Sequence, residues 1–229
     1  MGYSKDRDRR SATLLNSILS ECPFDKMERM IRGKPVFVIG AGPSISYSIP
    51  YLKRHKDIVK ICADSALVPL MQGGIIPQIV VTDLDGDLQV MKKLSKTKTI
   101  FVVHAHGDNM ERLEFASNFR NCIGTTQTED VGRVRNFGGF TDGDRCVFLA
   151  SHFGAKKIFL FGMDFGQRIG KHSKTRRQDR KIKLKKLRHG KELLEWLAHK
   201  TSSELYTLSK PITGFKKIRY DAIDSKLVV

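Results

Sequence analysis

The chain has 229 residues, of which 40% are hydrophobic and 28% charged, and its formal net charge is +17. This length suits one large domain, or one domain with an appendage, and four scattered cysteines without a CxxC pair signal neither a disulfide framework nor a zinc site. Because no apolar run approaches the roughly 18–20 residues that span a bilayer and the polar start has no secretory apolar segment, we expect a cytoplasmic protein without a membrane partner.

Helices are predicted before the first strand. Apolar residues recur at helical spacing between Arg9 and Arg32, which indicates one or two amphipathic helices interrupted near Pro23. These helices either cover a sheet face or form a contact between two copies in a homodimer.

From residue 35 onward, short apolar runs alternate with helical segments. Strands are expected at 35–40, 58–64, 78–83, 99–108, 121–127, 157–164 and 203–209, with helices between them and a last helix that continues through Trp196 and Leu197. This alternation predicts an α/β fold with a mostly parallel, Rossmann-like three-layer sheet, helices on both faces, and N-terminal helices. The expected segments are an N-terminal helical segment at 1–33, an α/β catalytic domain at 34–208 with a basic lid and helix at 166–200, and a C-terminal tail at 209–229.

The first strand ends in the glycine turn GAGPS at residues 40–44. The turn resembles part of a dinucleotide fingerprint, but the third glycine is missing. Backbone N–H groups at such a turn, next to a helix N-terminus, favour an anionic oxygen, so Gly40, Gly42, Pro43 and Ser44 are predicted to bind the nucleotide. A plain tight turn, with Ser44 capping the next helix, is the alternative.

Acidic residues follow the second and third strands. Asp64 ends the second, and the third runs directly into TDLDGD, with Asp83, Asp85 and Asp87 at alternate positions. Because the carboxyl ends of parallel strands open on one edge, we expect these carboxylates to meet there. Asp87 fits a helix N-cap, whereas Asp64, Asp83 and Asp85 are predicted to hold Mg²⁺ through oxygen ligands. The alternative is a solvated turn.

The fourth strand ends in HAHGDN. His104 and His106 should face the same way if the strand continues that far. They are candidate catalytic residues that donate hydrogen bonds to phosphate or substrate, and the alternatives are a transition-metal site with Asp108 or simple structural roles. Asp108 and Asn109 are assigned to substrate binding.

Two polar residues that follow the later strands are also expected at the carboxyl edge of the sheet. Gln127 follows the fifth strand, and Asp142 starts an apolar helix, either as part of its cap or as a functional group. Both are predicted to bind substrate.

The positive charge is concentrated in one segment. Residues 168–191 hold twelve Lys or Arg and one Asp, so +11 of the net +17 lies there. The segment has no aromatic interleaving and no recognisable nucleic-acid-reading module, which argues against nucleic acid as the partner. A solvated helix is one alternative. A lid that neutralises a bound polyphosphate is the other, with Arg176, Arg177 and Lys181 as its nucleotide-binding residues.

Several motifs in register resemble a known family. The segment ICADSALVPLMQGGIIPQIVVTDLDGD is similar to the strand ends of thiamin pyrophosphokinases. The closer similarity is to archaeal MptE-like 6-hydroxymethyl-7,8-dihydropterin pyrophosphokinases, through VIGAGPS, ADSAL, VVTDLDGD, HAHGDN, GGFTDGDRCVFLA and LFGMDFG, which together cover residues 35–166.

The resemblance implies diphosphate transfer from ATP to the hydroxymethyl group of a reduced pterin, with release of AMP, in tetrahydromethanopterin or folate biosynthesis. It implies that Asp64, Asp83 and Asp85 hold Mg²⁺, with Asp83 and Asp85 catalytic, and it places Asp130 at a later acidic position of the family. Three alternatives stay open: a thiamin pyrophosphokinase, a sugar-nucleotide glycosyltransferase with the same core, and a non-enzymatic nucleic-acid-binding module.

Overall fold

The computed structural model describes residues 4–173 and 175–227, so that residues 1–3 and 228–229 of the expected terminal segments and Lys174 of the expected lid lie outside the described residues. The described residues contain one eight-stranded sheet in the order β5-β4-β3-β2-β1-β6-β7-β8, and every neighbouring pair is parallel. The strands are β1 (Pro35–Ile39), β2 (Val59–Ala63), β3 (Ile79–Thr82), β4 (Ile100–Ala105), β5 (Cys122–Thr126), β6 (Lys157–Phe161), β7 (Glu204–Thr207) and β8 (Lys216–Lys217).

Both faces of the central strands are buried, which explains why their sequences are continuous apolar runs. In β1, Phe37 and Ile39 belong to the core on one face, while Val36 and Val38 belong to the core on the other. This is the two-residue alternation of a pleated strand placed between two helical layers.

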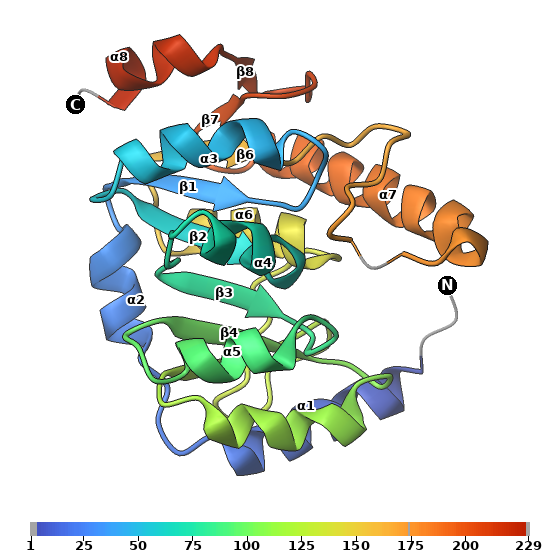
Figure 1. Ribbon diagram of the computed structural model, residues 1–229. Helices are drawn as coiled ribbons and strands as arrows, with labels where there is room; N and C mark the ends of the chain where they lie inside the picture. The colour runs from blue at the N-terminus through green and yellow to red at the C-terminus, as the bar shows by residue number, and fades with distance from the viewer. Residues whose placement is uncertain (1–3, 174, 228–229) are drawn as a thin grey trace.

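Helices cover both faces of the sheet (Figure 1). One core includes residues of α1 (Lys5–Ile18), α3 (Ile45–Arg54), α4 (Leu67–Gln72), α5 (Leu88–Leu94), the 3₁₀ helix η2 (Met110–Asn118) and α8 (Ile223–Leu227). The other core includes residues of α2 (Phe24–Ile31), α6 (Asp142–His152) and α7 (Arg180–Ala198). Short 3₁₀ turns stand at η1 (Asp64–Ala66), η3 (Arg177–Asp179) and η4 (Tyr220–Ala222).

The predicted α/β class and the N-terminal helices are confirmed. The first helices separate at Pro23, where α2 begins, and both bury apolar residues against the sheet, so they cover sheet faces as one of the two alternatives expected. Residues 110–118 form a 3₁₀ helix rather than an ordinary helix. The segment predicted as a C-terminal tail contributes β8, η4 and α8. The sequence pattern does not indicate β8, because this strand is two exposed lysines without an apolar run.

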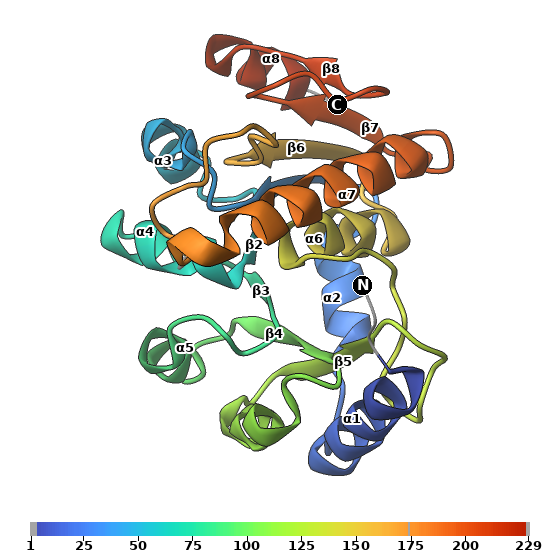
Figure 2. The same cartoon turned by 90° about the vertical axis from the view of Figure 1, so that its right-hand side faces the viewer.

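All carboxyl ends of the strands open on one edge of the sheet, because the sheet is parallel throughout. Figure 2 looks onto this edge, and α7 runs across it. None of the helices in the described part of the chain is long and apolar enough to cross a membrane.

Candidate active site

A cleft of about 740 Å³ opens at the carboxyl edge, beneath one face of α7. Its walls are the tips of β1 to β6, the first turn of α6, and residues of the loop and helix from 164 to 187. Most of the residues predicted for the site line it: Gly40, Gly42, Pro43, Asp64, Asp83, Asp85, His104, His106, Gln127 and Asp142.

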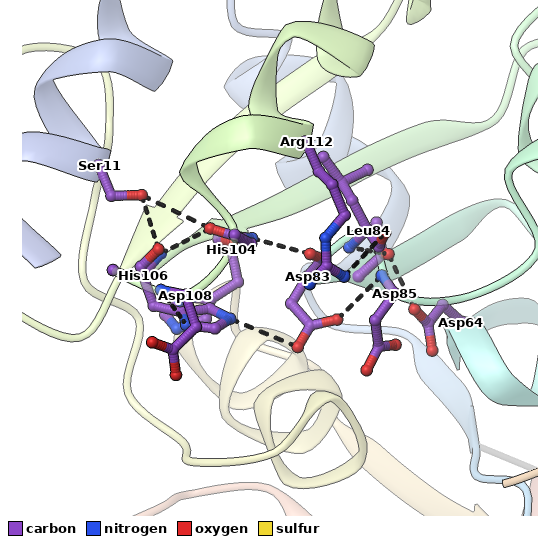
Figure 3. Close-up of polar contacts among 12 residues, drawn as sticks. Ser11, Asp64, Asp83, Leu84, Asp85, His104, His106, Asp108 and Arg112 are labelled. Atoms are coloured by element: carbon purple, nitrogen blue, oxygen red, sulfur yellow. Dashed lines mark hydrogen bonds and ion pairs between the residues drawn. The ribbon is translucent and has the colours of Figure 1, made fainter. Parts of the chain in front are cut away.

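Four carboxylates meet in this cleft. Asp64, Asp83, Asp85 and Asp142 each contribute one oxygen, and these oxygens all lie within 4.8 Å of one another. Figure 3 shows Asp64, Asp83 and Asp85 projecting toward the same side from neighbouring strand ends. The three residues predicted to bind metal are therefore brought together, and Asp142, which was assigned to substrate, joins them as the fourth acid.

The loop after β3 is shaped to present these acids. Leu84 is buried and has a positive φ of 66°, an uncommon conformation for a residue with a side chain. The hydroxyl of Thr82 accepts the Leu84 N–H at 2.8 Å and donates to Asp64 Oδ2 at 2.9 Å. A Cβ at Gly86 would lie 2.9 Å from Asp64 Oδ2, so a side chain there would displace this carboxylate. Thr82, which no sequence pattern indicated, thus connects the loop to Asp64 beside the neighbouring strand.

The crowded carboxylates change one another's protonation. Burial raises the pKa of Asp64 to about 8, and the charges of Asp85 and Asp83 add to the effect. Burial, Asp64 and the other two acids raise the pKa of Asp142 well above its usual range. Burial would also raise the pKa of Asp83, but hydrogen bonds with His106 and Asp85 outweigh it, and the pKa of Asp83 is lowered. Four ionised carboxylates this close repel one another unless a cation is bound.

The two histidines face the same way, as predicted from their spacing. Their rings stack with centroids 5.5 Å apart. His106 Nε2 lies 3.5 Å from Asp83 Oδ2, and His104 Nε2 lies 3.0 Å from Nη2 of the buried Arg145. Because a guanidinium only donates, His104 Nε2 must accept, which puts the ring proton on Nδ1. Burial, and then the charge of Arg145, lowers the pKa of His104 well below its usual value.

Asn109 and Asp108, both assigned to substrate binding, are not among the residues that line the cleft. Asn109 is buried, and its Nδ2 donates to the carbonyls of Asp83 at 2.8 Å and His104 at 2.7 Å, while its Oδ1 accepts the His106 N–H at 3.0 Å. It therefore positions the backbone under the acids and histidines. Asp108 is exposed, and its N–H donates to His106 Nδ1 at 3.3 Å.

The glycines of the GAGPS turn are required by the residues that directly follow the neighbouring strand β6. A Cβ on Gly40 would lie 2.6 Å from Met163 Sδ, and one on Gly42 would overlap Asp164 Oδ2. Asp164 Oδ2 accepts the Ser44 N–H at 2.9 Å, so the anionic oxygen at this turn is a carboxylate of the protein. Ser44 stands at the N-cap of α3, but its side chain makes no capping bond, and it does not line the cleft.

The cations over the cleft differ from those predicted. Arg168 and Lys171 from the loop and Lys183 and Lys186 from α7 line the cleft. Residues 182, 183, 186 and 187 share one helical face, as 3.6 residues per turn require, and that face points into the cleft.

The three predicted nucleotide-binding cations lie outside this face. Arg176, Arg177 and Lys181 are exposed and are not among the lining residues, and Arg176 pairs with Asp179 at 2.8 Å. The prediction chose cations by their density in the sequence, whereas the helical register decides which of them face the cleft.

Of the two later acids, Asp142 joins the carboxylates of the cleft, whereas Asp130 lies outside it. Asp130 pairs with Arg135 at 3.0 Å and accepts the Asn136 N–H at 2.8 Å, and it does not line the cleft. Asp142 is the first residue of α6, and α7 can approach the start of α6 because Gly190 has no Cβ, which would lie 2.8 Å from Asp144 Oδ1.

The family model and the most similar curated proteins in the comparisons name the same enzyme family. The model of a family described as 6-hydroxymethylpterin diphosphokinase MptE-like matches residues 10–170. A 6-hydroxymethyl-7,8-dihydropterin pyrophosphokinase of Methanocaldococcus jannaschii is 42% identical over 221 residues, covering 89% of this chain and 92% of the relative. The protein of the same name from Pyrococcus furiosus is 44% identical over 219 residues, covering 91% and 93%.

Among solved structures, a MAf glycosyltransferase from Magnetospirillum magneticum AMB-1 is similar, with a TM-score of 0.59 and 14% sequence identity. The match covers 97% of this chain and 40% of that chain. At this identity the likeness shows a shared fold alone.

Proposed function

The chain belongs to the MptE-like family of 6-hydroxymethylpterin diphosphokinases, and from this premise we infer that it is an ATP-using 6-hydroxymethyl-7,8-dihydropterin pyrophosphokinase. In this reaction the hydroxymethyl oxygen bonds to the β-phosphorus of ATP, the bond from that phosphorus to the oxygen bridging to the α-phosphorus breaks, and AMP leaves with that oxygen. The structural observation that carries the proposal is the cluster of four carboxylates beneath a basic helical face.

The donor set of the cluster fits magnesium. All four groups are carboxylates, and hard divalent cations prefer oxygen ligands, whereas a zinc-type site would include histidine or cysteine. The raised pKa of Asp64 and of Asp142 indicates that the cluster needs positive charge to be fully ionised. Asp64, Asp83, Asp85 and Asp142 are thus the proposed ligands. Bound there, magnesium would neutralise charge that develops on the phosphates during transfer.

The cations of α7 and of the loop before it are the proposed triphosphate contacts. Lys183 and Lys186 face the cleft, and the charge of Lys183 acts on Asp85. Arg168 and Lys171 line the cleft near the tips of β1 and β6. These groups hold the phosphate chain over the acids, which suits phosphoryl transfer because it depends on positioning and charge neutralisation.

His106 is proposed to donate a hydrogen bond to phosphate or substrate, because its Nδ1 accepts the Asp108 N–H at 3.3 Å and its ring proton therefore lies on Nε2. It lines the cleft and lies 3.5 Å from Asp83, which orients it. His104 is less suited, because its Nε2 is already engaged with Arg145 and its ring is buried. We assign His104 and Arg145 to positioning the wall on which the substrate rests.

The pterin is proposed to lie at the β4 and β5 end of the cleft. The tips of β2 and β3 carry the acids, and the basic loop after β6 lies on the far side of them in the strand order. A diphosphoryl group transferred in line at the acids has its donor on one side and its acceptor on the other. Gln127, which directly follows β5, offers a polar contact on the acceptor side.

A nucleotide assay tests this function directly. Protein, ATP, Mg²⁺ and 6-hydroxymethyl-7,8-dihydropterin should give AMP and the pterin diphosphate, whereas thiamin should give little AMP. Formation of ADP instead would mean γ-phosphoryl transfer, and no nucleotide turnover with any alcohol would contradict the proposal. A sugar-nucleotide glycosyltransferase or a nucleic-acid-binding module would give no AMP under these conditions.

Asp83→Asn is expected to lower AMP formation at least about 100-fold while the circular dichroism spectrum is unchanged, because an amide cannot supply the same charge to the metal. Asp108→Asn is the matched control, since Asp108 is an exposed acid on the same edge that does not line the cleft. Near-normal turnover of the Asp83 variant would remove it from the metal site, and a strong loss in the Asp108 variant would support substrate binding by that residue.

A further inference from the structure

Helix α1 is fastened to the turn that follows β4. Arg7 Nη2 donates to the Gly107 carbonyl at 2.9 Å, and Asp8 Oδ1 accepts the Gly107 N–H at 2.8 Å. Ser11 Oγ donates to the His106 carbonyl at 2.9 Å, a contact visible in Figure 3. The helix therefore fixes the backbone of His106, whose side chain lines the cleft.

Asp8 also makes a contact at the cleft wall. Its carboxylate is buried, with 4% of the residue exposed, and its Oδ2 accepts a hydrogen bond from Gln127 Nε2 at 2.7 Å. Gln127 follows the last residue of β5 and lines the cleft. A residue 119 positions earlier in the chain thus sets the orientation of a cleft side chain.

The polarity of this contact determines what Gln127 presents. A carboxylate only accepts hydrogen bonds, and an amide has one donor end and one acceptor end. The nitrogen of Gln127 must therefore face Asp8, which leaves Oε1 as the end available to the cleft. The amide nitrogen and oxygen of a glutamine look alike in a structure, but Asp8 can only accept, so it fixes which end of the Gln127 amide is the nitrogen.

We propose that Asp8 is a positioning residue that holds Gln127 as a hydrogen-bond acceptor for the N–H donors of the pterin ring. The inference rests on the proposed function and assigns a specificity role within it. The aminopyrimidinone edge of a pterin carries an amino group and a ring N–H, and a site built to accept from them discriminates strongly against rings that lack them. The nucleotide is assigned to the other end of the cleft, because Arg168 and Lys171 follow β6 whereas Gln127 follows β5, and these strands lie on opposite sides of the acids in the strand order.

Reversing the amide tests the proposal. In Asp8→Asn, the Gly107 N–H still needs an acceptor, so the nitrogen of the introduced amide faces Gln127, whose side chain must turn over and present its N–H to the cleft. In the double variant Asp8→Asn with Gln127→Glu, the introduced carboxylate accepts from the introduced amide with one oxygen and presents the other, so the acceptor is restored. Asp6→Asn, at an exposed acid of the same helix, is the control.

Two measurements are made on full-length protein with unchanged circular dichroism: AMP release with each substrate varied, and binding of fluorescent 6-hydroxymethylpterin without ATP. We expect Asp8→Asn to raise the KM and Kd for pterin about tenfold, with the KM for ATP unchanged, and the double variant to return both to within about threefold of wild type. Asp6→Asn should match wild type.

The outcomes distinguish a failure of the role proposed for Asp8 from a failure of the proposed pyrophosphokinase function. Wild-type protein that neither binds pterin nor releases AMP would overturn the proposed function and this inference together. An active wild type whose Asp8→Asn variant loses affinity for both substrates, loses only kcat, or is not rescued by Gln127→Glu would overturn the inference alone, because each pattern indicates a structural role for Asp8.

Discussion

At the scale of single residues, Thr82 tests whether the acids depend on a buried hydroxyl. It donates to Asp64 Oδ2 at 2.9 Å and accepts the Leu84 N–H at 2.8 Å. Thr82→Val keeps the shape but leaves Asp64 and the Leu84 N–H without this partner, so we expect about 1–3 kcal/mol lower free energy of unfolding and weaker Mg²⁺ binding. Urea unfolding and Mg²⁺ titration by calorimetry measure the two effects.

Thr99→Val is the matched control for that substitution. Thr99 is also buried and donates to the Pro77 carbonyl at 2.9 Å, but it precedes β4 and so lies at the opposite end of the strands from the acids. It should lower stability similarly and leave Mg²⁺ affinity unchanged. Equal loss of Mg²⁺ affinity in both variants would show that the effect comes from general destabilisation.

The sequence predicts the spatial neighbours of some site residues and not of others. Asp64 and Asp83 each directly follow a buried strand, so parallel topology alone brings them to one edge. Asp142 starts α6, well after β5 ends, and nothing in the spacing indicated that it would join the acids. Asn109 looked like a substrate ligand because it is polar and near the edge, but its hydrogen bonds to backbone groups are fixed by tertiary structure.

At the scale of elements, the helical register of α7 separates two lysines of similar sequence context. Lys183 faces the cleft, whereas Lys181 is exposed and is not among the lining residues. If α7 neutralises the triphosphate, Lys183→Gln should raise the KM for ATP about tenfold, because a charge-assisted contact to phosphate is lost. Steady-state AMP release with ATP varied measures it.

Lys181→Gln provides the comparison on the opposite face. Its KM for ATP should stay within about twofold of wild type, since an exposed charge in water contributes little to a specific contact. If both variants changed equally, the helix would act through its overall charge, and the particular face described by the structure would not matter.

The elements themselves were largely predictable, and their register was not. Continuous apolar runs such as PVFVI mark strands buried on both faces, which parallel sheets require. Density of charge placed a basic helix over the edge correctly, but it could not tell which lysines face the acids. That depends on how α7 packs on the rest of the molecule, where Gly190, Leu194 and Leu197 are buried, and this packing is a tertiary contact rather than a property of the segment itself.

At the scale of the whole molecule, the fold class follows from the order of strands and helices, but the last strand does not. A right-handed crossover between parallel strands leaves few topologies for alternating segments, so the central sheet could be inferred. β8 consists of Lys216 and Lys217, which pair in register with Tyr206 and Thr207 of β7. An edge strand this short depends on the strand beside it, so its own sequence carries no signal.

The metal-free protein should become less stable as pH rises, because its acids must ionise against one another. Asp64 has a pKa of about 8 in the fold, against 3.8 for the ordinary carboxyl, so between these values the folded state holds a proton that the unfolded chain has released. Stability from this group is therefore complete below about pH 4 and is lost as pH rises through 8. In EDTA, we expect the free energy of unfolding of wild type, relative to Asp64→Asn, to fall by on the order of 2 kcal/mol over this range.

Magnesium should reverse this trend in wild type alone. A cation bound by the four carboxylates stabilises the folded state by an amount that grows with the ratio of its concentration to its Kd, so at pH 8 excess Mg²⁺ should raise the Tm of wild type more than that of Asp64→Asn. Thermal melts of both proteins in EDTA and in Mg²⁺, from pH 5 to 8, measure the effect, and taking the difference between the two proteins cancels the titration of groups elsewhere. Parallel curves with and without Mg²⁺ would mean that the cluster is held apart by its own hydrogen bonds and does not require a metal, which would remove the physical basis for placing the phosphates there.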